Sequence, residues 1–158
     1  MISIRKATQF DLPAISEIVT KYFVDEIHEG VEILEEHADA SKFISFYKDR
    51  MRNKVPFVIY IASKDDEIIG IAGGNAGLHH WSYTSKWGRE DFWFVKKEHR
   101  GGKAGLMLFE KLMEWFESVG VHRIHMTHYT WNPKIEHFYR KKGFIPYEIN
   151  YVYKVKEN

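Results

Sequence analysis

An amphipathic helical pattern over residues 104–119 constrains the fold more than any other segment of this 158-residue chain. Its apolar side chains recur every three or four positions, at Leu108, Phe109, Leu112, Trp115, Phe116 and Val119. Gly120 stands where a helix C-cap belongs, and residues 121–127 predict a strand directly afterwards. A helix that connects two strands of one sheet is a crossover, so part of the sheet is expected to be parallel.

The other segments also alternate between strand and helix patterns. Strands are expected at residues 2–4, 57–62, 68–72, 91–95, 144–147 and 150–155, and the polar residues 65–67 predict a hairpin turn. Helices are expected at residues 12–22 with Asp11 as N-cap, at residues 40–51, and from Asn132 to a stop at Gly143. We therefore expect one α/β domain over residues 1–158, in which helices flank a central mixed sheet.

The composition excludes several classes of protein. No cysteine is present, which rules out disulfides, thiolate metal sites and cysteine nucleophiles. The chain has 23 Lys and Arg against 22 Asp and Glu, and a net charge of +1 gives no field that attracts nucleic acid or an anionic membrane. No apolar stretch approaches the roughly 20 residues that span a bilayer, and no secretory signal opens the sequence. We expect a cytoplasmic protein.

A glycine-rich loop connects the strand that ends at Val95 to the helix that follows. Gly101 and Gly102 let the backbone approach a ligand closely, and the free amides of the first helical turn attract an anion. Arg100 and Lys103 add positive charge. The loop is not a Walker A motif, because Lys103 is followed by Ala104. Taken alone, a glycine turn that leads into an amphipathic helix is the simpler interpretation of this loop.

A second pattern lies downstream. Asn132, Tyr139, Gly143 and Phe144 match N-x-x-A-x-x-x-Y-x-x-x-G-F, with Ile135 where a small residue is usual. The loop matches Q/R-x-x-G-x-G/A in two registers, either from His99, with Gly102 and Ala104, or from Arg100, with Gly105 and with Lys103 in place of a glycine. With both motifs at this separation, the chain resembles the GCN5-related N-acetyltransferase (GNAT) superfamily.

This resemblance implies an acetyl-CoA-dependent N-acetyltransferase that transfers the acetyl group directly to a primary amine in a ternary complex. Acetyl-CoA would lie between the strand that ends at Val95 and the strand from Val121, with its pantetheine near the backbone of Phe94 and Val95. The pyrophosphate would rest on Arg100, Gly101, Gly102, Lys103, Ala104 and Gly105. Asn132 would bind the pantetheine arm, and Tyr139 would protonate the departing thiolate. Locally, Asn132 also fits an N-cap and Tyr139 a core aromatic.

Direct transfer needs a neutral amine, and therefore a base. Glu90 and Asp91 enter the strand that ends at Val95, and either carboxylate is a candidate base. Strand alternation predicts that Asp91, Trp93 and Val95 share one face. Solvated charges at the end of a strand are the alternative for both acids.

Histidines raise two further questions. On a strand, His122 and His128 share a face about 20 Å apart and His125 points the other way, so no metal site is expected. His79 and His80 lie beside Trp81 and either line an acceptor pocket or only pack a loop.

The segment between Lys21 and Lys42 carries seven carboxylates, at positions 25, 26, 29, 32, 35, 36 and 39. An acidic rim favours a cationic acceptor such as a polyamine, an amino sugar or a lysine-bearing protein, although a solvated acidic face is the simpler interpretation. A different class of function is a catalytically degenerate CoA-binding or protein-interaction module of the same fold. Nucleic-acid binding is disfavoured by the net charge, and a homodimer is an expectation at the level of the family.

Overall fold

The protein folds around one five-stranded mixed sheet. A computed structural model describes residues 1–23, 26, 39–153 and 155. The strands are β1 (Ile2–Lys6), β2 (Phe57–Lys64), β3 (Glu67–Leu78), β4 (Lys86–Val95) and β5 (Arg123–His125), in that spatial order. The first four pair antiparallel, whereas β4 and β5 pair parallel, as the crossover through residues 104–119 predicted.

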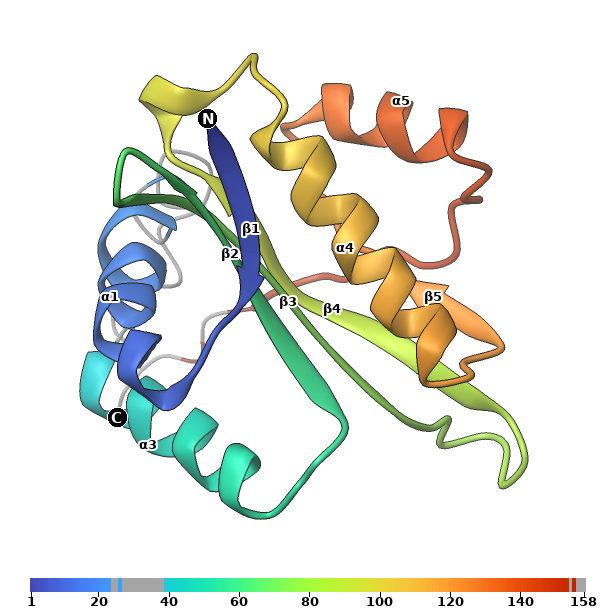
Figure 1. Cartoon of the computed structure of the whole chain (residues 1–158). Helices are drawn as coiled ribbons and strands as arrows, with labels where there is room; N and C mark the ends of the chain where they lie inside the picture. The colour runs from blue at the N-terminus through green and yellow to red at the C-terminus, as the bar shows by residue number, and fades with distance from the viewer. Residues whose placement is uncertain (24–25, 27–38, 154, 156–158) are drawn as a thin grey trace.

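Helices cover both faces of the sheet (Figure 1). One face carries η1 (Gln9–Asp11), α1 (Leu12–Glu17), its π-helical continuation η2 (Ile18–Phe23) and α3 (Ala40–Arg52). The other carries α4 (Ala104–Ser118), against which α5 (Pro133–Lys141) packs through the Phe109 and Phe138 rings, 5.0 Å apart. A 3-10 turn, η4 (Lys97–His99), precedes α4.

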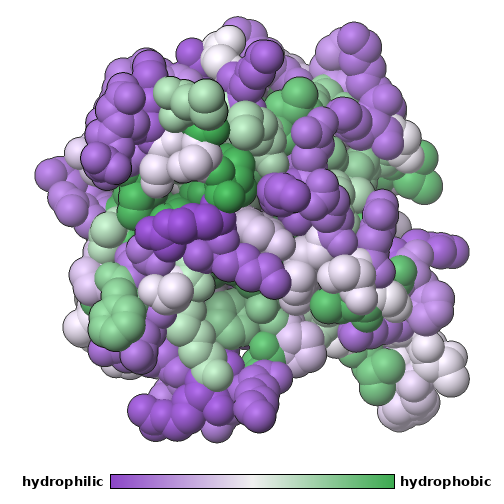
Figure 2. Space-filling model, viewed as in Figure 1, coloured by the Kyte–Doolittle hydropathy of each residue, from purple (hydrophilic) through white to green (hydrophobic). Residues whose placement is uncertain are grey.

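Two hydrophobic cores result, one on each face of the sheet. Leu108, Leu112 and Phe116 of α4 pack on alternate residues of β2, while Leu12, Ile15 and Tyr47 pack on the residues between them. This division follows from the two-residue period of a strand, which sends neighbouring side chains to opposite faces. In the same view, Figure 2 shows hydrophobic residues in several separate areas among hydrophilic ones, so the visible surface has no single continuous apolar face.

Local capping explains most helix ends. Asp39 accepts hydrogen bonds from the amides of Ser41 (2.9 Å) and Lys42 (3.1 Å) at the start of α3. Gly120 (φ +70°) and Gly143 (φ +87°) follow α4 and α5 in the left-handed conformation that ends helices. Asp11 does precede α1, but its carboxylate bonds Arg5 and the Thr8 amide rather than the amides of the helix.

The predicted strands near the carboxyl end are wrong. Residues 121–127 contribute only the three residues of β5, and residues 144–147 and 150–153 form no strand. Ile145 and Ile149 stay 82% and 72% exposed, respectively. Alternation supplies a face, but a strand also needs a neighbouring backbone, and no strand in the described part of the chain pairs with these residues.

Gly88 of β4 lies directly beneath α4, and a Cβ atom there would stand 2.4 Å from Cδ1 of Phe116. We expect Gly88→Ala to lower the free energy of unfolding by about 1–3 kcal/mol, because the buried ring and the strand must move apart. Gly77→Ala in β3 is the matched control, since its Cβ would meet nothing within 4 Å. Urea unfolding of both variants measures the difference, and equal effects would contradict this packing.

Candidate active site

A β-bulge in β4 sets the geometry of the site. Phe92 pairs with Gly73 and Glu90 pairs with Gly74, so Asp91 is the extra residue on β4. The side chain of Asp91 reaches the α3 face, where its carboxylate accepts hydrogen bonds from the Tyr47 hydroxyl (3.2 Å) and the Asn75 amide (2.6 Å).

The bulge corrects one prediction from the sequence. Phe92 lies on the α3 face with Asp91, whereas Trp93 and Val95 pack on the α4 face. The expectation that Asp91, Trp93 and Val95 share a face is therefore wrong, because one inserted residue shifts the alternation. Glu90 and Asp91 consequently point to opposite sides of the sheet.

Beyond the bulge, β4 and β5 separate. Their parallel pairing ends at Arg89 and His125, and β4 continues without β5 beside it. At this point side chains hold the backbone of Thr127: its N–H donates to Oε2 of Glu90 (2.9 Å), and its C=O accepts from the Tyr139 hydroxyl (3.1 Å). The opening between β4 and residues 126–131 thus has a carboxylate and a phenol at its inner end.

Burial perturbs the titration of these groups. Burial, with a smaller contribution from the charge of Asp91, raises the pKa of Glu90 to about 7, against the opposing effects of the Thr127 amide and the Tyr139 hydroxyl. Burial and the nearby Glu90 carboxylate raise the pKa of Tyr139. Burial also raises the pKa of Asp91, against hydrogen bonds from Asn75 and Tyr47. Glu90 is therefore the carboxylate whose proton equilibrium lies near neutral pH.

Tyr139 is positioned by α5 and a surrounding aromatic cluster. Pro133 begins the helix, and Tyr139 is only 7% exposed, with its ring near those of Trp93, Phe138 and Phe144. It is therefore a core aromatic as well as a residue of the opening, since its hydroxyl reaches Thr127. Asn132 precedes α5, and its side chain makes no capping hydrogen bond.

The glycine-rich loop lies at the carboxyl end of β4. Gly101 has φ +84°, and α4 begins at Ala104 with no side chain capping its first amides. The Trp93 indole donates to the carbonyl of Gly105 (3.0 Å), which ties the start of α4 to β4. Uncapped amides beside Lys103 form the kind of site that binds a phosphate.

Arg100 has partners in this structure. Its Nε donates to the Val95 carbonyl (2.8 Å), and its two terminal nitrogens form a bidentate ion pair with Glu26, at 2.6 Å for the longer contact. The guanidinium also lies over the Phe94 ring at 5.2 Å. A phosphate that used Arg100 would have to replace Glu26.

The structure brings Glu90 and Tyr139 together at the backbone of Thr127. Trp93 links this point to the loop, because its ring lies 6.1 Å from that of Tyr139 and its indole donates to the Gly105 carbonyl. Phe94 and Val95 follow on β4, beyond the end of its pairing with β5. Asp91 lies on the other face of the sheet. Sequence reasoning missed Thr127, whose contribution is only its backbone. It also missed Tyr47 and Asn75, because nothing in a helix or strand pattern shows that they bond Asp91.

The three histidines after α4 serve separate contacts. Nδ1 of His122 accepts the Lys86 amide (3.1 Å), the ring of His125 packs on Trp87, and His128 stacks on Tyr139. Of the acidic run before α3, only Glu26 and Asp39 fall inside the described ranges, so the predicted acidic rim lies mostly outside them.

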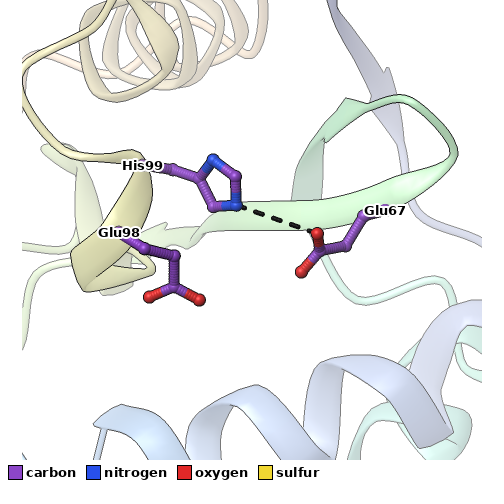
Figure 3. A group of neighbouring side chains, drawn as sticks. All are labelled: Glu67, Glu98 and His99. Carbon is purple, nitrogen blue, oxygen red and sulfur yellow. Dashed lines mark ion pairs between the residues drawn. The ribbon is translucent and has the colours of Figure 1, made fainter.

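Among the described residues, one group has metal-ligating geometry, with candidate ligand atoms within 4.8 Å of one another: Glu67, Glu98 and His99. Figure 3 shows the His99 ring directed at the Glu67 carboxylate, 3.8 Å away, with the Glu98 carboxylate to one side of this ion pair. The ammonium of Lys96 already lies 2.6 Å from Glu67. Glu67 therefore already has a cationic partner in this structure.

The chain matches the sequence profile of the acetyltransferase (GNAT) family over residues 12–144. No curated protein sequence matches it significantly. In the described part of the chain, no helix combines the length and apolar character needed to cross a membrane.

Solved structures share the fold at low sequence identity. A transcriptional regulator from Bacillus halodurans C-125 superposes with a TM-score of 0.77 and 18% identity, over 98% of this chain and 100% of that one. A predicted acetyltransferase from Clostridium acetobutylicum, solved with acetyl-CoA, gives 0.74 and 18%, over 98% and 96%. The enzyme AAC(6')-Iy, solved with a CoA-containing bisubstrate analog, gives 0.73 and 14%, over 99% of each chain.

The span that the family profile matches contains β2 to β5, the glycine-rich loop and α5. By this match, the chain belongs to the GNAT family of acetyltransferases.

Proposed function

We propose that the protein transfers the acetyl group of acetyl-CoA to a primary amine by direct attack in a ternary complex. The observation that carries this proposal is the arrangement at the opening. There Glu90 and Tyr139 both bond Thr127, beside the half of β4 that has no pairing with β5. Two structures with the same fold, at 18% and 14% identity, hold acetyl-CoA or a CoA-containing bisubstrate analog.

Acetyl-CoA would lie along the opening. The backbone of Phe94 and Val95 would meet the pantetheine, and Asn132 would bond it from the other side. The side chain of Asn132 makes no capping hydrogen bond to α5, which is consistent with this role. The pyrophosphate would take the free amides of the loop from Gly101 to Gly105, with Arg100 and Lys103 beside them.

The acceptor must lose a proton before it reacts. An amine of pKa about 10.4 is neutral in roughly one molecule in 2,500 at pH 7, a deficit of about 4.6 kcal/mol. Glu90 is the base that the site best supports, because its pKa of about 7 matches the pH at which it would work. Asp91 is held by Asn75 and Tyr47 on the other face.

Two protons leave the ammonium nitrogen in the reaction. Glu90 takes the first and releases it to solvent before attack. As the amine nitrogen bonds to the acetyl carbon, Glu90 takes the second proton, the bond from that carbon to sulfur breaks, and Tyr139 protonates the departing thiolate. Since the raised pKa of Tyr139 makes a lasting tyrosinate unfavourable, the neighbouring protonated Glu90 returns its proton to the phenol in the same step. The products are an amide and CoA.

Removal of the phenol tests the role of Tyr139. We expect Tyr139→Phe to lower kcat about 100-fold or more, because the thiolate loses its acid, while CoA still binds. Thermal unfolding measures binding, since CoA at 100 times its Kd adds about 2.7 kcal/mol of stability. Unchanged turnover in the variant would remove Tyr139 from the chemistry, and stabilisation by CoA without any turnover in the wild type would point to a module that only binds CoA. No stabilisation by CoA or acetyl-CoA would overturn the proposed function.

Replacement of Glu90 tests the base. We expect the wild-type rate to rise with pH through about 7 and then level off, as Glu90 loses its proton. Glu90→Gln should lose about 100-fold in kcat together with this rise. Asp91→Asn is the matched control and should keep the pH profile. A profile that disappears in Asp91→Asn instead would reassign the base to that residue.

The same variant has a readout that needs no acceptor. Glu90 holds its proton up to about pH 7 in the folded protein and up to about pH 4.5 when unfolded, so its contribution to stability falls as pH rises between these values and stays low above pH 7. Glu90→Gln should therefore gain stability over the wild type from pH 5 to pH 8, by at most about 3 kcal/mol. Urea unfolding at several pH values measures it, and a pH-independent difference would contradict the raised pKa.

The ion pair of Arg100 predicts competition with the cofactor. If phosphate replaces Glu26 on the guanidinium, Glu26→Gln should lower the Kd of CoA severalfold, because the competing carboxylate is gone. Glu110→Gln, on α4, is a control of the same charge change. Calorimetric titration with CoA measures both, and an unchanged or weaker Kd in Glu26→Gln would show that Arg100 keeps its partner when CoA binds.

A further inference from the structure

An open pocket of about 560 Å³ lies between the β3–β4 hairpin and the start of β5, a size typical of small-molecule sites. Its walls are aromatic: Trp81, Trp87 and Tyr147, of which Trp81 is 79% exposed. His79 stacks on Trp87 with ring centroids 3.9 Å apart, which fixes the hairpin against the sheet. A planar group would find flat partners here.

The pocket lies on the same face of the sheet as Asp91. Gly88 faces Phe116 of α4, so its neighbours Trp87 and Arg89 face the other way. Arg123 is the β5 partner of Trp87 and shares its face. From Trp87 to Asp91 is about 13 Å along the strand at roughly 3.3 Å per residue. The pairing of β4 with β5 ends at Arg89, between these two residues, and Glu90 bonds Thr127 across the gap that follows. One small molecule can therefore reach this gap from the pocket, on the face opposite to that of Glu90.

The free polar atoms at the pocket are hydrogen-bond donors. Nδ1 of His79 accepts the Trp81 amide (3.3 Å) and Nδ1 of His122 accepts the Lys86 amide (3.1 Å), so each ring carries its proton on Nε2. Nη1 of Arg123 donates to the carbonyl of His122 (2.8 Å), and within the described ranges its other N–H groups make no hydrogen bond. Donors without acceptors favour an oxyanion.

The charges agree with this polarity. The nine residues that line the pocket include Arg123 and no carboxylate. Arg89 lies on the same face between the pocket and Asp91, and its charge helps to lower the pKa of His79, after burial and the charge of His80, whereas Glu148 acts in the opposite direction.

We propose that this pocket holds the anionic end of the acceptor. The acceptor is then a primary amine with a carboxylate or phosphate on a planar group, about 10–13 Å from the reacting nitrogen by the strand spacing. This inference rests on the proposed acetyl transfer and names the substrate class of the same site. The acidic residues between Lys21 and Lys42 would then attract the ammonium end of the same molecule.

Matched acceptors test the proposal. The series comprises aminoalkylbenzenes, the corresponding aminoalkylbenzoic acids with a free ring carboxylate, and the corresponding aminoalkylphenyl phosphate monoesters, each assayed with acetyl-CoA. We expect KM to be at least tenfold lower for one or both anionic members than for the neutral one, and the better of the two identifies the oxyanion. Arg123→Ala should abolish this preference without changing the KM of acetyl-CoA.

Arg52→Ala is the matched control, because Arg52 is exposed on α3 and pairs with Asp49 instead. It should keep the preference for anionic acceptors. If the neutral amine is acetylated as efficiently as both anionic ones, or if Arg52→Ala and Arg123→Ala behave alike, the pocket proposal is wrong and acetyl transfer stands.

A binding measurement separates the two proposals further. The indole N–H of Trp87 donates to the Ser85 hydroxyl at the pocket (2.9 Å), so its NMR signal, assigned with Trp87→Phe, should shift on titration with benzoate or phenyl phosphate but not with benzyl alcohol. Arg123→Ala should remove the shift. No shift overturns the anion site, whereas a shift in a protein that CoA fails to stabilise overturns acetyl transfer and the role in the acceptor together.

Discussion

The hydrogen bond from the Thr127 amide to Glu90 is the contact on which the site depends. Where β5 could have continued the parallel ladder, a side chain takes the backbone donor instead, and the two strands separate. The donor stays satisfied, so the opening costs little backbone hydrogen bonding. Tyr139 completes the exchange by donating to the carbonyl of the same residue. The surrounding rings of Trp93, Phe138 and Phe144 hold the Tyr139 ring in place for this contact.

This arrangement places reactivity and stability in opposition. A carboxylate with a pKa of about 7 is poorly solvated and destabilises the folded state at neutral pH. The cores on the two faces offset that cost, since α4 and α1 bury large side chains such as Phe116 and Leu12 completely. The sheet is thus stable enough at its centre to keep one edge open.

The sequence predicts the parts of this fold that rest on local physics. Helical spacing located α4, and the paired motifs located Tyr139 on α5 and the glycine-rich loop before α4, two segments that Trp93 links in the structure. It could not predict the bulge at Asp91, because a strand with one extra residue has the same composition as a regular one. The carboxyl-terminal residues show the opposite failure, since their alternation is regular but no described strand pairs with them. The partner of Arg100 was also beyond reach, as Glu26 lies 74 positions away.

The bulge also determines how this site tolerates change in length. Deleting Asp91 would restore regular pairing between β3 and β4 and would leave Glu90 and Trp93 on their present face, because Glu90 and Phe92 already pair with the adjacent residues Gly74 and Gly73. Substitutions at single positions leave this frame intact. A lineage could therefore lose Asp91 without changing the faces that its neighbours occupy, whereas an insertion or deletion of one residue elsewhere in β4 would turn the residues on one side of it to the opposite face.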